Sequence, residues 1–251
     1  MMKNIEIKYC SRESFIKKVE LNKTILEIGP FFNPVCKGKN VKYFDILSQK
    51  EMIQRATQIG QDDKVCNIPY IDFISKSGDL SVVNKKFDAI VSSHVVEHQL
   101  DFVEHLKMAS NLLKENGKYY LMVPDKRYCF DYYNHKSTIA DIINATYEKK
   151  ERHSIKSLIE HRVFLTHNDS QKHWNGYHGD IYNDIEKIKA AIVEYETGSY
   201  SDVHAWYFTD HSFLNIIQIL EKLNMIDLLI TELYPTSIGS IEFFAVLKKK
   251  A

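Results

Sequence analysis

The first half of the chain alternates short apolar runs with amphipathic segments. Four runs have the length of buried strands: residues 24–28, 41–44, 87–91 and 118–123. Three segments carry apolar residues at helical spacing: residues 11–20, 50–59 and 100–114, the last ended by Asn116-Gly117 as a C-terminal cap. Alternating strands and helices predict a mainly parallel sheet, whose ligands bind outside the carboxyl ends of the strands.

The composition changes in the segment 125–207. It holds nine of the 15 tyrosines, seven of the 11 histidines and both tryptophans, and it shows no clear strand pattern. We expect it to be a mostly helical insertion, or lid, within a single domain of residues 1–251. The sheet pattern then resumes, with a helix capped by Thr209 and a terminal hairpin over residues 226–234 and 241–247.

The overall charge gives no sign of a polyanionic partner. The 33 basic and 33 acidic side chains cancel, which argues against nucleic acid and anionic membranes. No stretch is apolar enough to span a bilayer, and residues 1–10 lack the apolar core of a signal peptide. Four widely spaced cysteines predict reduced thiols. We therefore expect a cytoplasmic protein with a small-molecule partner, and the sequence leaves the oligomeric state open.

Acids, a glycine and hydroxyl side chains follow the predicted strands. Glu27 and Gly29 end the first strand, Asp45 ends the second, and Ser92-Ser93-His94 follows the fourth. Without a Cβ, Gly29 allows a ligand to approach the backbone closely. A carboxylate at the end of the second strand is where such folds bind a ribose diol. This order favours a nucleoside ligand, although each feature alone is common.

These segments resemble the class I methyltransferases that depend on S-adenosylmethionine (SAM). The resemblance implies a Rossmann-like α/β fold, with a seven-stranded mainly parallel sheet, helices on both faces and the insertion after strand 5. It also implies SAM as the cofactor and assigns its contacts to these residues: Glu27, Gly29, Pro30, Phe31, Asp45, Asp72, Gly78, Asp79, Leu80, Ser92, Ser93 and His94. Pro30-Phe31 departs from the family, which often has a second glycine here.

Three segments resemble a subgroup of these enzymes that is associated with bacterial surface-glycan synthesis. They are residues 87–98, 123–128 and 202–209. The resemblance implies methyl transfer to an oxygen, with nitrogen as the second choice, of a sugar, a nucleotide sugar or a phosphorylated intermediate. A specific case is the phosphoramidate group of capsular polysaccharide.

A hydroxyl acceptor needs a group that takes its proton, and histidine is suited to this near neutral pH. His98 and His94 are the nearest candidates, while His204 and Tyr128 reach the same mouth from the insertion. The structural alternatives are that His98 braces a helix, that His94 only lines the cofactor and that His204 joins insertion and core. Arg127 either clamps an anionic group of the acceptor, together with Tyr128 and His204, or pairs with Asp125 or Asp131.

Two other classes of protein remain as alternatives. His94-Val95-Val96-Glu97-His98 fits a zinc peptidase motif, but that motif lies within a helix, whereas here a strand ends at Ser92 and the helical pattern begins near Leu100. The looser histidines of the insertion favour a polar pocket or plain surface: His161, His167, His173 and His178. We therefore expect no metal. The second alternative is a non-catalytic protein of the same fold that assists a glycan assembly enzyme.

Overall fold

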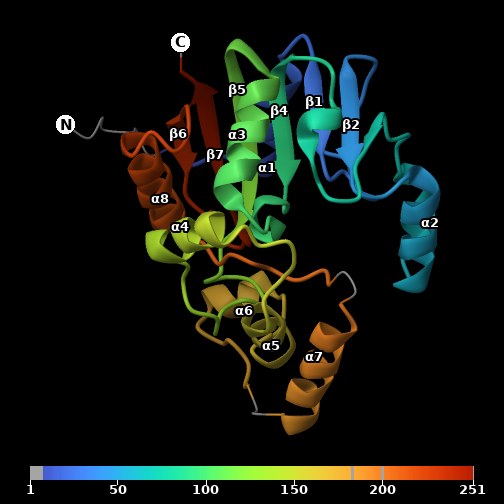
Figure 1. Cartoon of the computed structure of the whole chain (residues 1–251), viewed down its shortest axis with the longest axis vertical. Helices are drawn as coiled ribbons and strands as arrows, with labels where there is room; N and C mark the ends of the chain where they lie inside the picture. Colours follow the sequence, from blue (N-terminus) through green and yellow to red (C-terminus); the bar gives the residue numbers. More distant parts are fainter. Residues whose placement is uncertain (1–7, 182–183, 199–200, 251) are drawn as a thin grey trace.

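One mixed sheet forms the centre of the molecule. The computed structural model describes residues 8–181, 184–198 and 201–250 (Figure 1). The sheet has seven strands in the order β3-β2-β1-β4-β5-β7-β6. Their bounds are β1 Ile25–Ile28, β2 Val41–Asp45, β3 Phe73–Ile74, β4 Phe87–Ser93, β5 Leu113–Pro124, β6 Leu228–Tyr234 and β7 Glu242–Lys249. Only β7 runs antiparallel to its neighbours, β5 and β6. The expected class I methyltransferase fold is confirmed.

Helices cover both faces of this sheet. The α-helices are α1 Arg12–Glu20, α2 Gln49–Gln58, α3 Phe102–Leu112, α4 Ile139–Glu148, α5 Ile155–Val163, α6 Ser170–Trp174, α7 Ile185–Thr197 and α8 Asp210–Lys222. Three short 3-10 helices are η1 Asp62–Asn67, η2 Leu80–Val82 and η3 Val96–His98. Buried side chains of α3, α4 and α8 pack with Ile90 and Leu121 in the main core, whereas α1 packs with Val91 and Tyr120 on the opposite face. The alternation along β4 and β5 thus separates two cores.

The sequence of α8 shows why this helix forms where it does. Thr209 accepts a hydrogen bond from the backbone N–H of Ser212, and Ser212 returns one to Thr209, which makes a capping box. Apolar side chains at helical spacing, Phe213, Ile216, Ile217 and Leu220, are all buried against the sheet.

The predicted end of the helix before β5 was wrong. α3 ends at Leu112, and Asn116-Gly117 lies inside β5, where Asn116 has a φ of 60°. Leu113 pairs with Phe87, but the next paired residues are Ala89 and Lys118, so β5 carries an irregularity between them. The physical reason is burial: Leu113 is only 1% exposed and packs in the main core as a strand residue.

The segment after β5 is mainly helical in its described part and carries α4 to α7. Residues 182–183 and 199–200 of the expected insertion lie outside the described residues. Asp125 and Phe208 form a β-bridge, so the chain leaves and re-enters the sheet region at one point. Figure 1 shows α5, α6 and α7 beyond the edge toward which β2 and β4 point. Within the described ranges, no helix is both long and apolar enough to cross a bilayer.

Candidate active site

The parallel register brings three of the expected cofactor residues to one edge of the sheet. Ile28 of β1 pairs with Phe44 of β2 and with Ser92 of β4, so Gly29, Asp45 and Ser93 follow side by side. The backbone N–H of Gly29 donates to the carbonyl of Phe44 at 2.9 Å, which fixes the turn after β1. The strand order therefore reverses around β1 and β4 at the place where open α/β sheets bind ligands.

The turn after β1 depends on Gly29. Its φ is +70°, and a Cβ built there would lie 2.6 Å from Cγ2 of Val95. The next residues, Pro30 and Phe31, continue the turn, and Phe31 has a φ of 40° while its ring lies 4.4 Å from that of Phe32. Both residues thus shape the loop where the family often has a second glycine, and their contact with the cofactor stays a prediction.

The Gly29→Ala variant should lower the free energy of unfolding by about 2 kcal/mol and weaken cofactor binding about tenfold, because strain and a clash with Val95 add together. Chemical denaturation and calorimetry measure the two effects. Gly60→Ala is the matched control, since Gly60 also has a φ of +70° but its Cβ would meet nothing within 4 Å. Equal effects of the two substitutions would contradict the role of this close approach.

The side chain of Glu27 fixes the loop that follows β1. Its side chain is buried, and its two oxygens accept hydrogen bonds from the backbone N–H groups of Val35 at 2.6 Å and Cys36 at 3.0 Å. Burial raises the pKa of Glu27 to about 7, and these two hydrogen bonds act in the opposite direction. The carboxylate therefore positions the loop rather than standing open to a ligand, and its predicted cofactor role is at most indirect.

Asp45 lies at the carboxyl end of β2, where a ribose diol was expected. Its Oδ1 accepts a hydrogen bond from the backbone N–H of Leu47 at 2.9 Å. Burial raises the pKa of Asp45 to about 6, although hydrogen bonds from the following backbone N–H groups oppose the shift. The carboxylate is thus ionised at neutral pH and placed to accept hydrogen bonds from hydroxyl groups.

This raised pKa predicts the pH dependence of cofactor binding. Above pH 6 the ionised Asp45 accepts charge-assisted hydrogen bonds from the ribose, and below pH 6 protonation removes them. We expect the affinity for S-adenosylhomocysteine (SAH) to fall about tenfold between pH 7.5 and pH 5, as measured by calorimetry. The Asp45→Asn variant should show a flat profile across this range, and a wild-type affinity that falls only near pH 4 would contradict the prediction.

The segment expected to border the adenine divides into two groups. Asp72 accepts hydrogen bonds from Nζ of Lys42 at 2.6 Å and from the backbone N–H of Tyr43 at 3.0 Å, so it fastens the next segment to β2. Leu80 is buried in the main core. Gly78 lies beside Ile46, and Asp79 caps η2 through the N–H of Ser81. The side chains of Asp72 and Leu80 are therefore engaged within the protein, and the cofactor contacts of all four residues stay predictions.

The serines after β4 also differ in their surroundings. Ser92 is buried, and its hydroxyl lies 2.9 Å from the hydroxyl of Tyr119, which makes its side chain part of the core. Ser93 accepts a hydrogen bond from Nη2 of Arg12 at 3.0 Å. Any contact of Ser92 with the cofactor must therefore come from its backbone.

Arg127 pairs with acidic side chains, which is one of the two roles that the sequence left open. Its Nε donates to Asp125 at 2.9 Å, and its Nη2 donates to Asp210 at 2.9 Å. Both carboxylates are almost fully buried. Asp131, the other acid considered, pairs with His204 instead. The guanidinium is thus engaged by two acids, which removes the basis for assigning it an acceptor group.

We expect Arg127→Ala to lower the free energy of unfolding by about 2 kcal/mol, because Asp125 and Asp210 would lose their cationic partner in a buried place. Denaturant unfolding measures it. Arg162→Ala, which breaks a more exposed pair with Glu194, is the control and should change stability by less than about 1 kcal/mol. If Arg127→Ala had normal stability but a raised KM for the acceptor, Arg127 would instead bind an anionic group of the acceptor.

Tyr128 and the histidines of the insertion form aromatic stacks. The ring of Tyr128 lies 3.9 Å from that of Trp174 at an angle of 3°.

Three of the histidines lie together: His167, His173 and His178 are joined by ring contacts and by a 3.0 Å contact between the Nδ1 atoms of His173 and His178. His161 is not part of this group, since its ring contacts those of Phe130 and His204. The four histidines singled out in the sequence therefore do not form one cluster.

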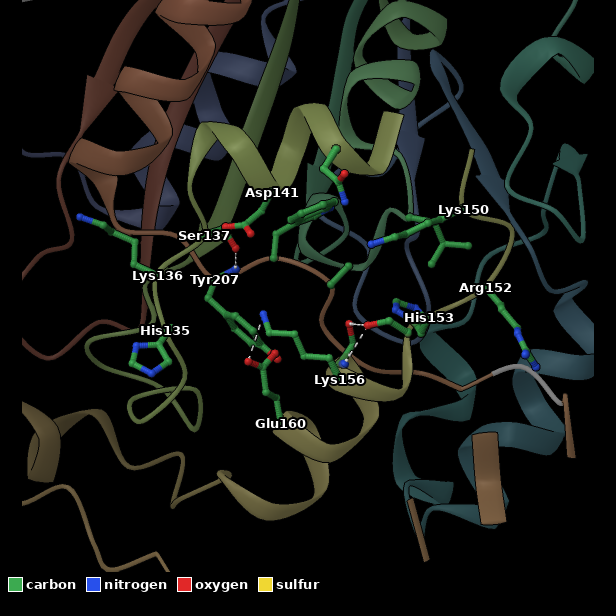
Figure 2. A pocket seen from close by; sticks show the side chains of 16 residues that line it. His135, Lys136, Ser137, Asp141, Lys150, Arg152, His153, Lys156, Glu160 and Tyr207 are labelled. Atoms are coloured by element: carbon green, nitrogen blue, oxygen red, sulfur yellow. Dashed lines mark hydrogen bonds and ion pairs between the residues drawn. The ribbon is translucent and has the colours of Figure 1, made fainter. Parts of the chain in front are cut away.

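A pocket of about 270 Å³ opens between α4 and α5 (Figure 2). Its lining includes four cationic side chains, Lys136, Lys150, Arg152 and Lys156, and two acidic ones, Asp141 and Glu160. Ala205 and Trp206 also line it, and their backbone N–H groups donate to the carbonyl of Glu97 at 2.7 and 3.1 Å. The pocket thus adjoins the segment that follows β4.

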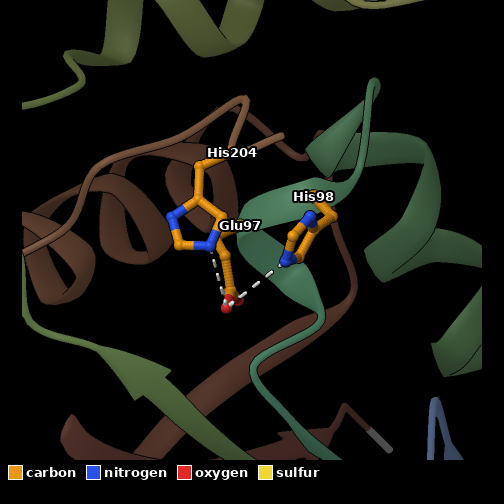
Figure 3. Close-up of side chains that lie close together, drawn as sticks. All are labelled: Glu97, His98 and His204. Carbon is orange, nitrogen blue, oxygen red and sulfur yellow. Dashed lines mark ion pairs between the residues drawn. The ribbon is translucent and has the colours of Figure 1, made fainter. Parts of the chain in front are cut away.

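Three ionisable side chains converge beside that pocket (Figure 3). Oε1 of Glu97 lies 4.0 Å from Nε2 of His98 and 3.9 Å from Nε2 of His204. His94 lies next to this group, with Nδ1 3.9 Å from the same oxygen and Nε2 3.0 Å from Glu242. His98, His204 and His94 were expected at this mouth, whereas Glu97 was considered only as part of the peptidase motif.

The peptidase arrangement of the same motif is absent. η3 covers only Val96–His98, and His94 precedes it with a φ of 55°. His94 and His98 therefore do not lie one turn apart on a helix, as two zinc ligands of that motif must. Instead, the second histidine beside Glu97 and His98 comes from the far end of the insertion.

Comparison with known proteins agrees with this geometry. A family model described as "Methyltransferase domain" matches residues 14–185, more than half of the chain. The chain belongs to this methyltransferase family. Its cofactor is accordingly SAM, and the methyltransferase has the fold that the family implies. No curated protein sequence matches it.

Solved structures similar to the methyltransferase have low sequence identity to it. A SAM-dependent methyltransferase from Clostridium acetobutylicum ATCC 824 is 14% identical, with 98% of this chain and 94% of that chain covered and a TM-score of 0.49. The 1,6-didemethyltoxoflavin-N1-methyltransferase of Burkholderia thailandensis is 10% identical, with 96% and 78% covered and a TM-score of 0.48. Magnesium protoporphyrin IX methyltransferase from Synechocystis PCC 6803 is 9% identical, with 95% and 82% covered and a TM-score of 0.44.

Proposed function

We propose that the methyltransferase transfers the methyl group of SAM to a hydroxyl oxygen of a small, polar, negatively charged acceptor. A nucleotide sugar or a phosphorylated sugar has this chemistry. The observation that carries the proposal is the pocket between α4 and α5, which is rich in cationic side chains and adjoins the histidines beyond β4.

The charges of the pocket favour an anionic group. Four cationic side chains face two carboxylates, and two of the cations already have acidic partners: Lys156 lies 3.3 Å from Glu160, and Lys150 lies 3.1 Å from Glu148 outside the lining. His153 also lines the pocket, and its Nδ1 is buried and makes no hydrogen bond to any described residue. A phosphate or carboxylate of the acceptor would supply the negative charge that this lining lacks.

The chemistry requires orientation more than activation. The methyl carbon of SAM forms a bond to the acceptor oxygen while its bond to sulfur breaks, and the electron pair stays on sulfur to give SAH. A nearby basic group must take the hydroxyl proton. The side chains of His94, Glu97 and His98 follow β4 at the edge of the sheet where we expect the cofactor. We propose that this group positions the hydroxyl and takes part in removing its proton.

We place the acceptor among the intermediates of bacterial surface-polysaccharide synthesis, with a phosphoramidate-bearing sugar as a specific case. The support for this part is the resemblance of residues 87–98 and 123–128 to enzymes of that process. The cationic pocket is compatible with it, because a phosphoramidate also carries negative charge.

An acceptor panel tests the proposal. Purified protein with SAM is incubated with nucleotide sugars, sugar phosphates and the corresponding neutral sugars, and mass spectrometry detects methylated products. We expect kcat/KM for anionic acceptors to exceed that for neutral ones at least about tenfold, with the methyl group on oxygen. Methylation of neutral sugars alone, or of nitrogen alone, would contradict it.

A double variant links the preference to the pocket. Lys150→Gln with Lys156→Gln should raise KM for the anionic acceptor about tenfold and leave SAH affinity unchanged. Lys189→Gln, on the exposed surface of α7, is the control. An unchanged KM in the double variant would remove this pocket from acceptor binding.

A further inference from the structure

We propose that Glu97, His98 and His204 bind one divalent first-row metal ion, such as Zn²⁺, Mn²⁺ or Co²⁺. The sequence predicted no metal, and the rejected peptidase motif paired Glu97 and His98 with His94. The structure provides a different third ligand. The site itself stands on the geometry alone, whereas its use in binding the acceptor rests on the proposed function.

The first observation is the isolation of the Glu97 carboxylate. This side chain has no exposed surface, and among the described residues neither of its oxygens has a hydrogen-bond partner. A buried carboxylate without a hydrogen bond is strongly unfavourable, and the imidazoles of His94, His98 and His204 stay 3.9–4.0 Å from it, too far to donate one. A cation bound between Glu97 and the histidines would supply the missing interaction.

The second observation is the convergence of the donor atoms. The Nε2 atoms of His98 and His204 approach the same Oε1 of Glu97, and the two imidazole rings are perpendicular with centroids 4.6 Å apart. One donor atom from each residue lies within 4.8 Å of the others. Bonds of about 2.0–2.2 Å to a central ion require donors about 3 Å apart, so small rotations of the side chains complete the site.

The third observation is the outer partners of both histidines. Nδ1 of His204 lies 2.6 Å from Oδ2 of Asp131, and Nδ1 of His98 lies 3.2 Å from Oδ1 of Asp202. In protein metal sites, a ligating histidine commonly directs its other nitrogen to a carboxylate, which fixes the ring and its tautomer. The His204 ring is held in this way, with Nε2 left toward Glu97, whereas Nδ1 of His98 lies within ion-pair distance of Asp202 and makes no hydrogen bond to any described residue.

His94 also directs one nitrogen to an outer carboxylate, but it is not part of the group whose donor atoms all lie within 4.8 Å of one another. Its Nε2 lies 3.0 Å from Oε2 of Glu242, and Glu242 is itself paired with Arg12 at 2.6 Å. The His94 nitrogen nearest Glu97 is Nδ1. His94 lies outside η3, and its backbone has a left-handed conformation. His204 is therefore the better third ligand, because its ring is buried and its donor atom lies within 4.8 Å of those of both Glu97 and His98.

The donor set indicates the class of ion and leaves room for the acceptor. Two imidazoles and one carboxylate suit Zn²⁺, Mn²⁺ and Co²⁺ better than Mg²⁺ or Ca²⁺, which favour oxygen ligands. Three protein ligands leave coordination positions open, and the His98 side chain is 25% exposed, which gives a path to the site. An acceptor hydroxyl bound there would lose its proton more readily.

Metal binding is measured directly on the full chain. Protein stripped with a chelator is titrated with Zn²⁺, Mn²⁺ and Co²⁺ separately, by calorimetry and by metal analysis after dialysis. We expect one equivalent of at least one ion, and a rise in melting temperature of about 5 °C at a hundredfold excess over Kd. His204→Ala and Glu97→Gln should each weaken binding at least tenfold.

Two control variants distinguish the ligand set. His161→Ala alters a ring beside His204 that is not a proposed ligand, and His94→Ala removes the ligand of the rival set. Both should retain binding. SAH titration of every variant shows whether its fold is intact. No stoichiometric binding by wild-type protein that binds SAH, or unchanged binding by His204→Ala, would overturn the metal site.

Activity separates this proposal from the proposed function. A bound ion with no methylation of any anionic acceptor would contradict the acceptor proposal and leave the metal site standing. Methylation at the full rate by protein that binds no ion would overturn the metal site and leave the acceptor proposal standing.

Discussion

The His98→Ala variant should transfer methyl groups at least about 100-fold more slowly than the wild type and still bind SAH within about threefold of its affinity. Nε2 of His98 lies 4.0 Å from Oε1 of Glu97, and its Nδ1 lies 3.2 Å from Oδ1 of Asp202. Loss of a group that orients the hydroxyl or receives its proton lowers kcat by about 10²–10⁴ without removing cofactor contacts. Single-turnover transfer and SAH calorimetry measure the two quantities.

A surface histidine serves as the control for this substitution. His211 is exposed at the start of α8, so His211→Ala should keep both transfer and SAH binding. If His98→Ala retained full turnover, His98 would only brace the segment after β4, as the structural alternative holds. A loss of SAH affinity as large as the loss of turnover would instead indicate local misfolding.

The Asp45→Ala variant should bind SAH about 50-fold more weakly than the wild type. Asp45 ends β2 beside Gly29, and its Oδ1 accepts a hydrogen bond from the backbone N–H of Leu47. We expect the carboxylate to accept further hydrogen bonds from the ribose hydroxyls. Hydrogen bonds to a charged group contribute about 1.5–3 kcal/mol, and the lower half of this range already corresponds to more than tenfold in affinity.

Asp88→Ala provides the matched control. Asp88 lies at the opposite end of the sheet, near the start of β4, where it pairs with Lys114 at 2.8 Å. Its removal should leave SAH affinity unchanged. Equal losses in the two variants, or an unchanged affinity in Asp45→Ala, would exclude the ribose role of Asp45.

Most of the fold was predictable because local patterns and the core agree. The apolar residues that define β4, β5 and α8 are the ones buried against each other, and the cap Thr209 is where the sequence placed it. The end of α3 was not predictable from Asn116-Gly117. Its position depends on Leu113, which is buried as a strand residue beside Phe87.

The candidate site was predictable only where it follows from the sheet. Parallel strands bring their carboxyl ends together, so Gly29 and Asp45 had to meet. The partners of the insertion depend on tertiary packing that no spacing encodes: Arg127 reaches Asp210 of α8, and His204 reaches both Asp131 and Glu97. The motif around Glu97 was visible in the sequence, but its burial and third partner were not.

In a calorimetric titration of the purified, metal-stripped wild-type protein with SAH, we expect one SAH per chain with micromolar or tighter affinity, which corresponds to about 8 kcal/mol of binding free energy or more. Absence of SAH binding by folded protein would contradict the assignment of the edge formed by Gly29 and Asp45 as a SAM site.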